Sequence, residues 1–140
     1  MVTPEIIAVR EKTLAAHLDG ESRKDVDAVL ATFSGVPRYE LMSVDKVIDG
    51  QDEVRKFLQV FFDSMGPNEH IGEAFYHSPS ATAVEVLTVF PDGFDGKQTG
   101  QVIKVRTVGV FTFEGDKMLA EKLYADVSPL VPFMPWLVDA

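Results

Sequence analysis

Few side chains in this sequence could do chemistry, and they are spread along the chain. Asp126 ends the last predicted strand, and Tyr39 lies on the first. His77 falls at a strand end and His17 on a helix. A tyrosine hydroxyl can donate to a substrate carbonyl or enolate, and a histidine can exchange a proton near neutral pH. A carboxylate joins such a set when partial burial raises its pKa. These residue types favour acid–base chemistry on a bound small molecule.

Each candidate also has a purely structural interpretation, and the sequence leaves both open. Asp126 could cap the turn over Val127–Leu130. Tyr39 could be an amphipathic core residue. His77 precedes a Ser-Pro turn and could be solvated there. His17 could be a satisfied residue at the core boundary.

Metal and cofactor chemistry find little support in the sequence. The three histidines, among them His70, are dispersed and are interpreted as a poor metal site, with His70 expected to be exposed. The absence of cysteine excludes disulfides, thiolate metal sites and cysteine nucleophiles. There is no glycine-rich phosphate loop either. We therefore expect no metal and no cofactor.

Charge and hydropathy limit the classes of partner that this chain could bind. The net charge is −9 and the pI about 4.7. Basic residues form isolated pairs such as Arg23-Lys24, each flanked by acids, whereas a phosphate-binding surface needs clustered Lys and Arg. No segment approaches the roughly 20 apolar residues of a membrane span, and the N-terminus has no apolar run of signal length. We expect a cytoplasmic protein with neither nucleic acid nor membrane as a partner.

The elements that must position these residues follow from capping and periodicity. Thr3-Pro4 predicts a helix start and Gly20 its end. A capping-box variant at Ser22–Asp25 opens a second helix, and the period changes to two from Glu69. We expect helices at 4–20, 23–33 and 49–65, short strands within 38–48, and strands at 69–78, 81–90, 101–113 and 117–127. Sequential strands joined by turns predict a mostly antiparallel sheet in one α+β domain spanning 1–140.

The C-terminal segment 128–140 is rich in proline and apolar residues. Pro129, Pro132 and Pro135 recur every third residue, which favours an extended polyproline-type segment. So many exposed apolar side chains would promote aggregation. We predict that this segment packs on the pocket mouth or on a second subunit; a floppy terminus is the alternative.

Three stretches of the chain carry a resemblance to a known family. They are Leu30–Phe33 before the first strand, Val47–Gly50 ahead of the third helix, and the closing hairpin Gly109–Asp126. Over nearly its whole length the chain resembles the nuclear transport factor 2 (NTF2)-like superfamily. Within it, the chain is similar to the SnoaL-like polyketide cyclase and ketosteroid isomerase-like members. The resemblance implies a cystatin-like cone, in which three N-terminal helices pack on a curved, mostly antiparallel sheet.

The resemblance also implies a site and an assembly. Asp126 would be the general base that removes a proton next to a carbonyl, and Tyr39 and His77 would assist it as catalytic residues. The ligand would be a small hydrophobic molecule, and the protein a homodimer that packs through its sheet and possibly through the tail. The residues expected to contact the ligand are His17, Phe57, Phe61, Tyr124 and Arg106.

Three further interpretations accompany this expectation. The epoxide hydrolase branch uses an Arg-x-Asp on a middle strand and a second Asp on the last; Val86, Thr88 and Leu123 take these places, so we expect no epoxide hydrolysis. Arg106 could pair with Glu85 across strands, or the two could hold an anion in the pocket. A non-catalytic module for hydrophobic-ligand binding or dimerisation is the alternative to an enzyme.

Overall fold

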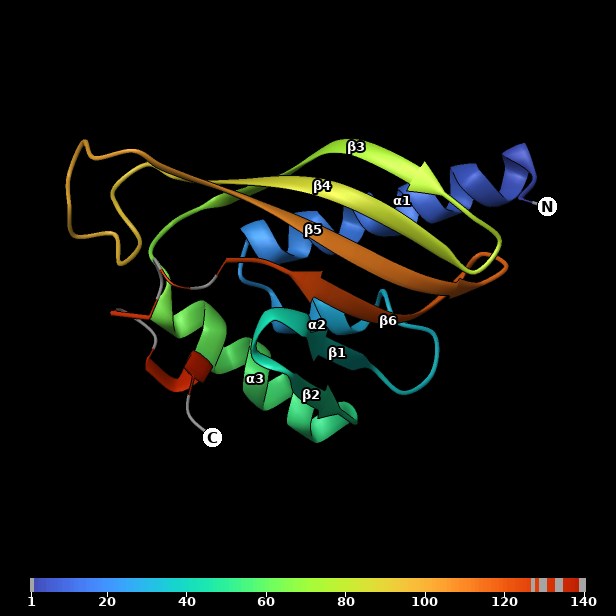
Figure 1. Cartoon of the computed structure of the whole chain (residues 1–140), viewed down its shortest axis with the longest axis horizontal. Helices are drawn as coiled ribbons and strands as arrows, with labels where there is room; N and C mark the ends of the chain where they lie inside the picture. The colour runs from blue at the N-terminus through green and yellow to red at the C-terminus, as the bar shows by residue number, and fades with distance from the viewer. Residues whose placement is uncertain (1, 127, 129–130, 133–134, 139–140) are drawn as a thin grey trace.

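The computed structural model describes residues 2–126, 128, 131–132 and 135–138, and Figure 1 shows its elements. Three α-helices and six strands form in the described part of the chain. None of the helices there is both long enough and apolar enough to cross a membrane. In chain order the elements are α1 Pro4–Ser22, α2 Val26–Leu30, β1 Arg38–Leu41, η1 Met42–Val44, β2 Lys46–Asp49, α3 Gln51–Ser64, β3 Glu69–His77, β4 Ala81–Phe90, β5 Ile103–Glu114, β6 Lys117–Tyr124 and η3 Pro135–Val138.

The first helix begins where the sequence predicts and continues past its predicted end. The Thr3 hydroxyl accepts a hydrogen bond from the Ile6 backbone N at 3.2 Å, with Pro4 in the first turn. The predicted stop at Gly20 is wrong, because Gly20 is helical and serves close packing. A Cβ there would lie 3.0 Å from the Val29 side chain on α2. Lys24, with φ of 55°, follows the helix instead.

The six strands form one mixed sheet in the order β2-β1-β6-β5-β4-β3. Only the β1–β6 pairing is parallel, and it sets Tyr39 beside Glu121. The predicted α+β cone with a mostly antiparallel sheet is confirmed. In Figure 1 the sheet curves along α1, while no helix lies in front of β4 and β5.

The core lies between the sheet and the helices. Alternate residues of β4 are buried on the face toward the helices, and α3 contributes Val54, Leu58 and Phe62 to the same core. The second helix is shorter than predicted because Asp25 caps it, its carboxylate accepting from Ala28 N at 3.0 Å.

A buried arginine ties α1 to two turns of the sheet. The Arg10 side chain is only 1% exposed. Its guanidinium donates to the backbone oxygens of Ser78 at 2.6 Å, Pro79 at 2.8 Å and Gly115 at 2.7 Å. The planar fork of arginine donors suits this convergence of carbonyls. Arg10 thus fixes α1 against the β3–β4 and β5–β6 hairpins.

The tail prediction falls largely outside the described residues. Of 128–140, the structure describes residue 128, residues 131–132 and the short helix η3. The predicted packing of this segment therefore stays a prediction.

Candidate functional site

A pocket opens between the inner face of the sheet and the helices. Its walls are mostly apolar, and both α3 and β5 supply aromatic rings to them. Concave, mostly apolar pockets with a few convergent polar groups are the usual form of small-molecule sites. The apolar walls include Leu18, Phe57, Leu58, Phe61, Phe90 and Phe111.

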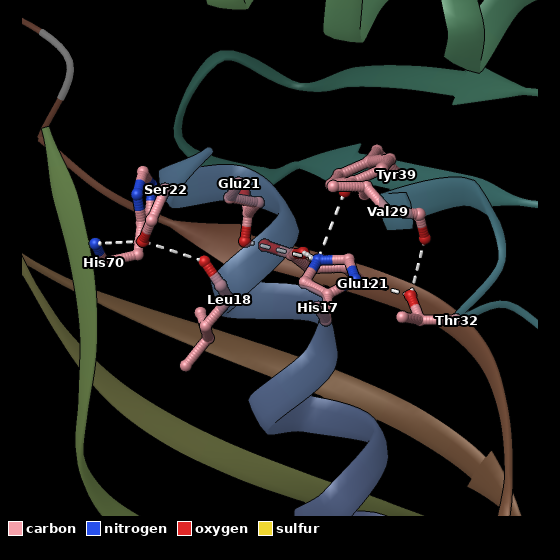
Figure 2. Close-up of polar contacts among 9 residues, drawn as sticks. All are labelled: His17, Leu18, Glu21, Ser22, Val29, Thr32, Tyr39, His70 and Glu121. Carbon is pink, nitrogen blue, oxygen red and sulfur yellow. Dashed lines mark hydrogen bonds and ion pairs between the residues drawn. The ribbon is translucent and has the colours of Figure 1, made fainter. Parts of the chain in front are cut away.

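Four side chains form what we call the acid–base cluster on one side of this pocket: His17, Glu21, Tyr39 and Glu121 (Figure 2). The Nε2 atom of His17 lies 2.9 Å from Oε1 of Glu121 and 3.3 Å from Oε1 of Glu21. The Tyr39 hydroxyl lies 3.3 Å from the same nitrogen. The His17 ring is fully buried, while both glutamates and Tyr39 line the pocket. The cluster therefore connects a buried imidazole to the pocket through three oxygen-bearing side chains.

The cluster is assembled by three elements. His17 and Glu21 are one helical turn apart on α1, so they share a face. The parallel pairing of β1 with β6 places Tyr39 opposite Glu121. A register shift between Thr112 and Phe113 decides the direction in which Glu121 points.

This shift changes which face the later residues of β6 present. Met118 is buried on the core side, so strict alternation would turn Glu121 outward. The irregularity inserts one extra residue into β6, and beyond it Glu121 pairs with Phe111 and faces inward. The carboxylate reaches the pocket because of this local irregularity.

Burial and mutual charge set the protonation of the cluster. Burial, aided by the nearby Glu121 carboxylate and opposed by His17, raises the pKa of Glu21 to about 8. Burial by itself would lower the pKa of His17, but Glu21 and Glu121 together raise it above its ordinary value. Burial and the same two carboxylates raise the pKa of Tyr39. Near neutral pH, Glu21 therefore presents a protonated carboxyl group to the pocket.

His70 also lines the pocket, which corrects its expected exposure. Its backbone N donates to Ser22 Oγ at 2.8 Å, and this hydroxyl donates to the Leu18 carbonyl at 2.9 Å, so β3 is held against the end of α1 (Figure 2). Its Nδ1 atom is buried without a hydrogen-bond partner among the described residues. Burial, followed by the charge of His17, lowers the pKa of His70 to about 4, so the ring is neutral at working pH.

The described part of the chain brings together one set of side chains that could hold a metal ion. The ligand atoms of His17, Glu21 and Glu121 lie within 4.8 Å of one another. One imidazole and two carboxylates suit several divalent cations. The same atoms already satisfy one another by hydrogen bonding, so a cation would have to displace the proton held between them.

The residues predicted for catalysis occupy three different environments. Tyr39 lies in the acid–base cluster. Asp126 is exposed at the rim of the pocket, where bonds from Ser128 lower its pKa, the reverse of the rise expected for a buried base. His77 does not line the pocket; its ring nitrogens lie 3.0 Å from Glu11 and 2.9 Å from Thr82.

The residues predicted to contact a ligand divide in the same way. Phe57 and Phe61 line the pocket, and His17 lies directly behind it. Tyr124 is 46% exposed and is not among the lining residues of this pocket. Arg106 is exposed and pairs with Glu73 at 3.2 Å rather than with Glu85, which was one of the two alternatives for this residue. Glu85 instead accepts from the Tyr76 hydroxyl at 2.6 Å.

Sequence reasoning missed Glu21 and Glu121. One signal for Glu21 was present, because the stretch His17-Leu-Asp-Gly-Glu21 has the spacing that places two side chains on one helical face. No comparable signal existed for Glu121, since its direction depends on the irregularity in β6.

Comparison with known proteins identifies the fold. No protein-family model matches the chain, and no curated protein matches its sequence. A SnoaL-like polyketide cyclase structure from Jannaschia sp. CCS1 superposes with a TM-score of 0.69 and 18% identity, covering 95% of this chain and 94% of that one. A protein from Catenulispora acidiphila with a ketosteroid isomerase-like fold, in complex with trimethylamine, superposes with a TM-score of 0.68 and 14% identity. The match covers 94% of this chain and 92% of that one.

A third similar structure is that of the epoxide hydrolase/cyclase-like enzyme SalBIII, described in pyran ring formation in the polyether salinomycin. It gives a TM-score of 0.67 and 16% identity over 86% of this chain and 92% of that one. At these identities the likeness establishes the architecture and leaves the reaction to be argued from the site.

Proposed function

We propose that this chain, whose fold is that of NTF2-like and SnoaL-like proteins, binds a small hydrophobic carbonyl compound and transfers a proton on it. One observation carries the proposal: the carboxyl groups of Glu21 and Glu121 both line an apolar pocket and lie 3.3 Å and 2.9 Å from Nε2 of the buried His17, an arrangement in which burial raises the pKa of Glu21 to about 8. Two carboxyl groups in different protonation states are the usual equipment for acid–base catalysis.

The roles follow from which group carries a proton. Glu121 would accept a proton from the carbon next to the carbonyl. Glu21 and Tyr39 would donate hydrogen bonds to the carbonyl oxygen, where negative charge develops. Glu21 would give its own proton to a different carbon of the enolate, and His17, which lies within reach of both carboxyl groups, would then pass the proton from Glu121 to Glu21 and restore the starting state. Such a sequence amounts to isomerisation or ring closure of an enolisable substrate.

Two features of the pocket support an uncharged substrate. Its walls are largely apolar. Among the described lining residues there is no Lys or Arg, while Glu21, Glu121 and Asp126 are acids. A carboxylate-bearing ligand would lack a counter-charge there.

Exchange of carbon-bound hydrogen tests the proposal without knowledge of the natural substrate. The unmodified protein is mixed with 2-indanone, 2-tetralone or androst-5-ene-3,17-dione in deuterated buffer, and deuterium uptake next to the carbonyl is followed by NMR. Glu121→Gln and Glu21→Gln should each lose about 100-fold or more of any acceleration. Asp126→Asn is the comparison, because Asp126 lies at the exposed rim.

The outcomes separate the candidates. An Asp126→Asn variant that alone abolishes exchange would restore the rim aspartate as the base. Full activity in both glutamate variants would remove the acid–base cluster from the mechanism.

A second candidate is a non-catalytic binding module for small amines. The lining of the pocket combines acids with aromatic rings, a combination that attracts alkylammonium ions, and one structural neighbour was solved with trimethylamine. Calorimetric titration with choline and with its uncharged analogue 3,3-dimethyl-1-butanol tests this. Tighter binding of choline, lost in Glu121→Gln, would favour the module, and equal binding would exclude selection by charge.

We also infer that the chain forms a homodimer through the outer face of the sheet. Tyr76 and Tyr124 are 59% and 46% exposed, and none of the helices in the described part of the chain covers β4 and β5 on that side (Figure 1). Light scattering measures the molecular mass in solution. The unmodified chain should have the mass of a dimer, and the Tyr124→Glu variant should have the mass of a monomer. A monomeric unmodified chain would contradict the inference.

A further inference from the structure

A threonine outside the pocket decides which nitrogen of His17 carries a fixed hydrogen. Thr32 follows the end of α2, and its Oγ1 atom lies 2.6 Å from the Val29 carbonyl oxygen and 2.8 Å from His17 Nδ1 (Figure 2). A hydroxyl has one hydrogen, and a carbonyl oxygen can only accept. The Thr32 hydrogen is therefore committed to Val29, and its oxygen presents lone pairs to the imidazole.

With the Thr32 hydrogen on the shorter of its two contacts, to the Val29 carbonyl, the imidazole donates from Nδ1. With that hydrogen in place, the neutral form of His17 has its free lone pair on Nε2. Nε2 is the atom that faces Glu121 at 2.9 Å and Glu21 at 3.3 Å, so when this nitrogen is unprotonated one of the two carboxyl groups holds the hydrogen between them. The hydrogen that comes and goes is thus directed toward the pocket, and the other is held away from it.

The surroundings keep the ring in this orientation. Phe33 and Phe111 meet the imidazole edge-on, with centroid distances of 5.6 Å and 5.3 Å and interplanar angles of 76° and 81°. Gly109 leaves room for the second ring, because a Cβ there would lie 2.7 Å from Phe111. A rotation of the imidazole about its Cβ–Cγ bond would break the hydrogen bond to Thr32 and bring the ring into steric conflict with both phenyl rings.

We infer that Thr32 is a positioning residue, which fixes the Nδ1–H tautomer of His17 and so reserves Nε2 for proton exchange with Glu21 and Glu121. The inference rests on the proposed function only in giving that exchange a purpose; the tautomer itself follows from the hydrogen bonds. The titratable groups that face His17 are Glu21 on α1, Glu121 on β6, Tyr39 on β1 and, electrostatically, His70 on β3.

Nitrogen NMR of the histidine rings tests the inference without a substrate, because the two ring nitrogens have different shifts when protonated and unprotonated. The chain has three histidines, so His70→Phe and His77→Phe identify the His17 signals. Spectra are recorded on the intact chain from about pH 6 to about pH 10. In the unmodified protein, Nδ1 should stay protonated throughout, and Nε2 should be the nitrogen that titrates.

Two variants of Thr32 complete the experiment. Thr32→Ser keeps the hydroxyl and should reproduce the unmodified pattern. Thr32→Val keeps the shape but removes the acceptor, so more than half of neutral His17 should shift to the Nε2–H tautomer and Nδ1 should become the titrating nitrogen. If Thr32→Val does not fold, the unmodified chain and Thr32→Ser still decide the matter.

An Nδ1 that titrates in the unmodified protein, or in folded Thr32→Ser, would overturn the inference. So would a folded Thr32→Val variant with the unmodified pattern. The deuterium-exchange assay fails or succeeds separately: a fixed Nδ1–H tautomer without any exchange would refute the proposed function and leave the positioning role of Thr32 intact.

Discussion

His17 Nε2 lies 2.9 Å from Glu121 Oε1, although 104 positions separate the two residues in the chain. The contact joins the first helix to the last strand and buries an imidazole against a carboxylate. Glu21 lies against the same nitrogen at 3.3 Å. The properties of the pocket follow from these three groups, and most of the predictions below change one of them or a neighbour.

Glu21→Gln should reduce the loss of stability at alkaline pH. The folded protein holds the Glu21 proton up to about pH 8, against 4.5 for the ordinary pKa. Because the native state binds this proton more tightly, its stabilising contribution is complete below about pH 4.5 and is lost as pH rises through about 8. The raised pKa of His17 acts in the same direction. In urea unfolding experiments, the free energy of unfolding should fall between about pH 5 and about pH 9, and this fall should be smaller by about 1 kcal/mol or more in the variant.

Glu69→Gln is the control for this measurement, because Glu69 is exposed on β3. It should leave the pH dependence unchanged. Identical slopes for Glu21→Gln and the unmodified chain would show that Glu21 ionises normally in the folded protein.

His70→Phe should reduce the loss of stability at acid pH. The pKa of His70 falls from 6.5 to about 4 on folding. The unfolded chain therefore binds the proton more tightly, and the contribution of His70 is complete above about pH 6.5 and is lost as pH falls through about 4. Thermal melting between about pH 7 and about pH 4.5 should show a smaller drop in Tm. The same change at His77, on the same strand but outside the pocket, measures the loss of a histidine as such; an equal effect there would contradict the assignment.

Glu121→Gln should lower the pKa of Glu21 below about 8. The substitution removes a like charge that raises the Glu21 pKa and leaves His17 with Glu21 as its remaining carboxylate partner. Both changes favour the ionised form of Glu21. Carboxyl-carbon NMR titration of the two proteins measures the difference directly. An unchanged or higher Glu21 pKa in Glu121→Gln would mean that the two carboxyl groups are not coupled.

Arg10→Lys should destabilise the fold without altering the pocket. A lysine has a single nitrogen and cannot reach the carbonyls of Ser78, Pro79 and Gly115 together, so buried acceptors would lose their donors. Urea unfolding should show a loss of about 2 kcal/mol or more. Arg23→Lys, at an exposed ion pair with Asp19, should cost less than about 1 kcal/mol. Similar losses of unfolding free energy in both variants would show that the buried hydrogen bonds of Arg10 stabilise the fold no more than an exposed ion pair does.

Removal of residues 129–140 should change the oligomeric state or lower Tm. The segment is rich in apolar side chains, which would be costly to leave in water. Light scattering and thermal melting of the shortened and full chains test this. No change in either quantity would support a tail that packs on nothing.

The sequence predicts the elements well because their signals are local. The Thr3 cap, the amphipathic face of α3 and the period-two strands depend on nearby residues, and these elements appear close to their predicted bounds. The predicted end of α1 is wrong because Gly20 allows close packing against α2, which is a neighbour in space and not in the local sequence.

The site is harder to read from the sequence for the same reason. Tyr39 was identified through the family resemblance, and the i, i+4 spacing of His17 and Glu21 was available but unused. Glu121 enters the pocket through an irregular pairing of β5 with β6, and His70 lines the pocket on a strand whose backbone bonds to Ser22 on another element. These placements are tertiary, and no local pattern encodes them.

The parallel pairing of β1 with β6 has a consequence for how the molecule is made. β6 inserts between β1 and β5, so the sheet is discontinuous until the last strand arrives. His17 and Glu21 therefore leave the ribosome long before Glu121 and remain hydrated until β6 docks. Because Glu21 holds a proton at neutral pH only once it is buried, completion of the sheet takes up a proton from solvent. Completion of the pocket is thus coupled to proton uptake and becomes less favourable as pH rises toward about 8.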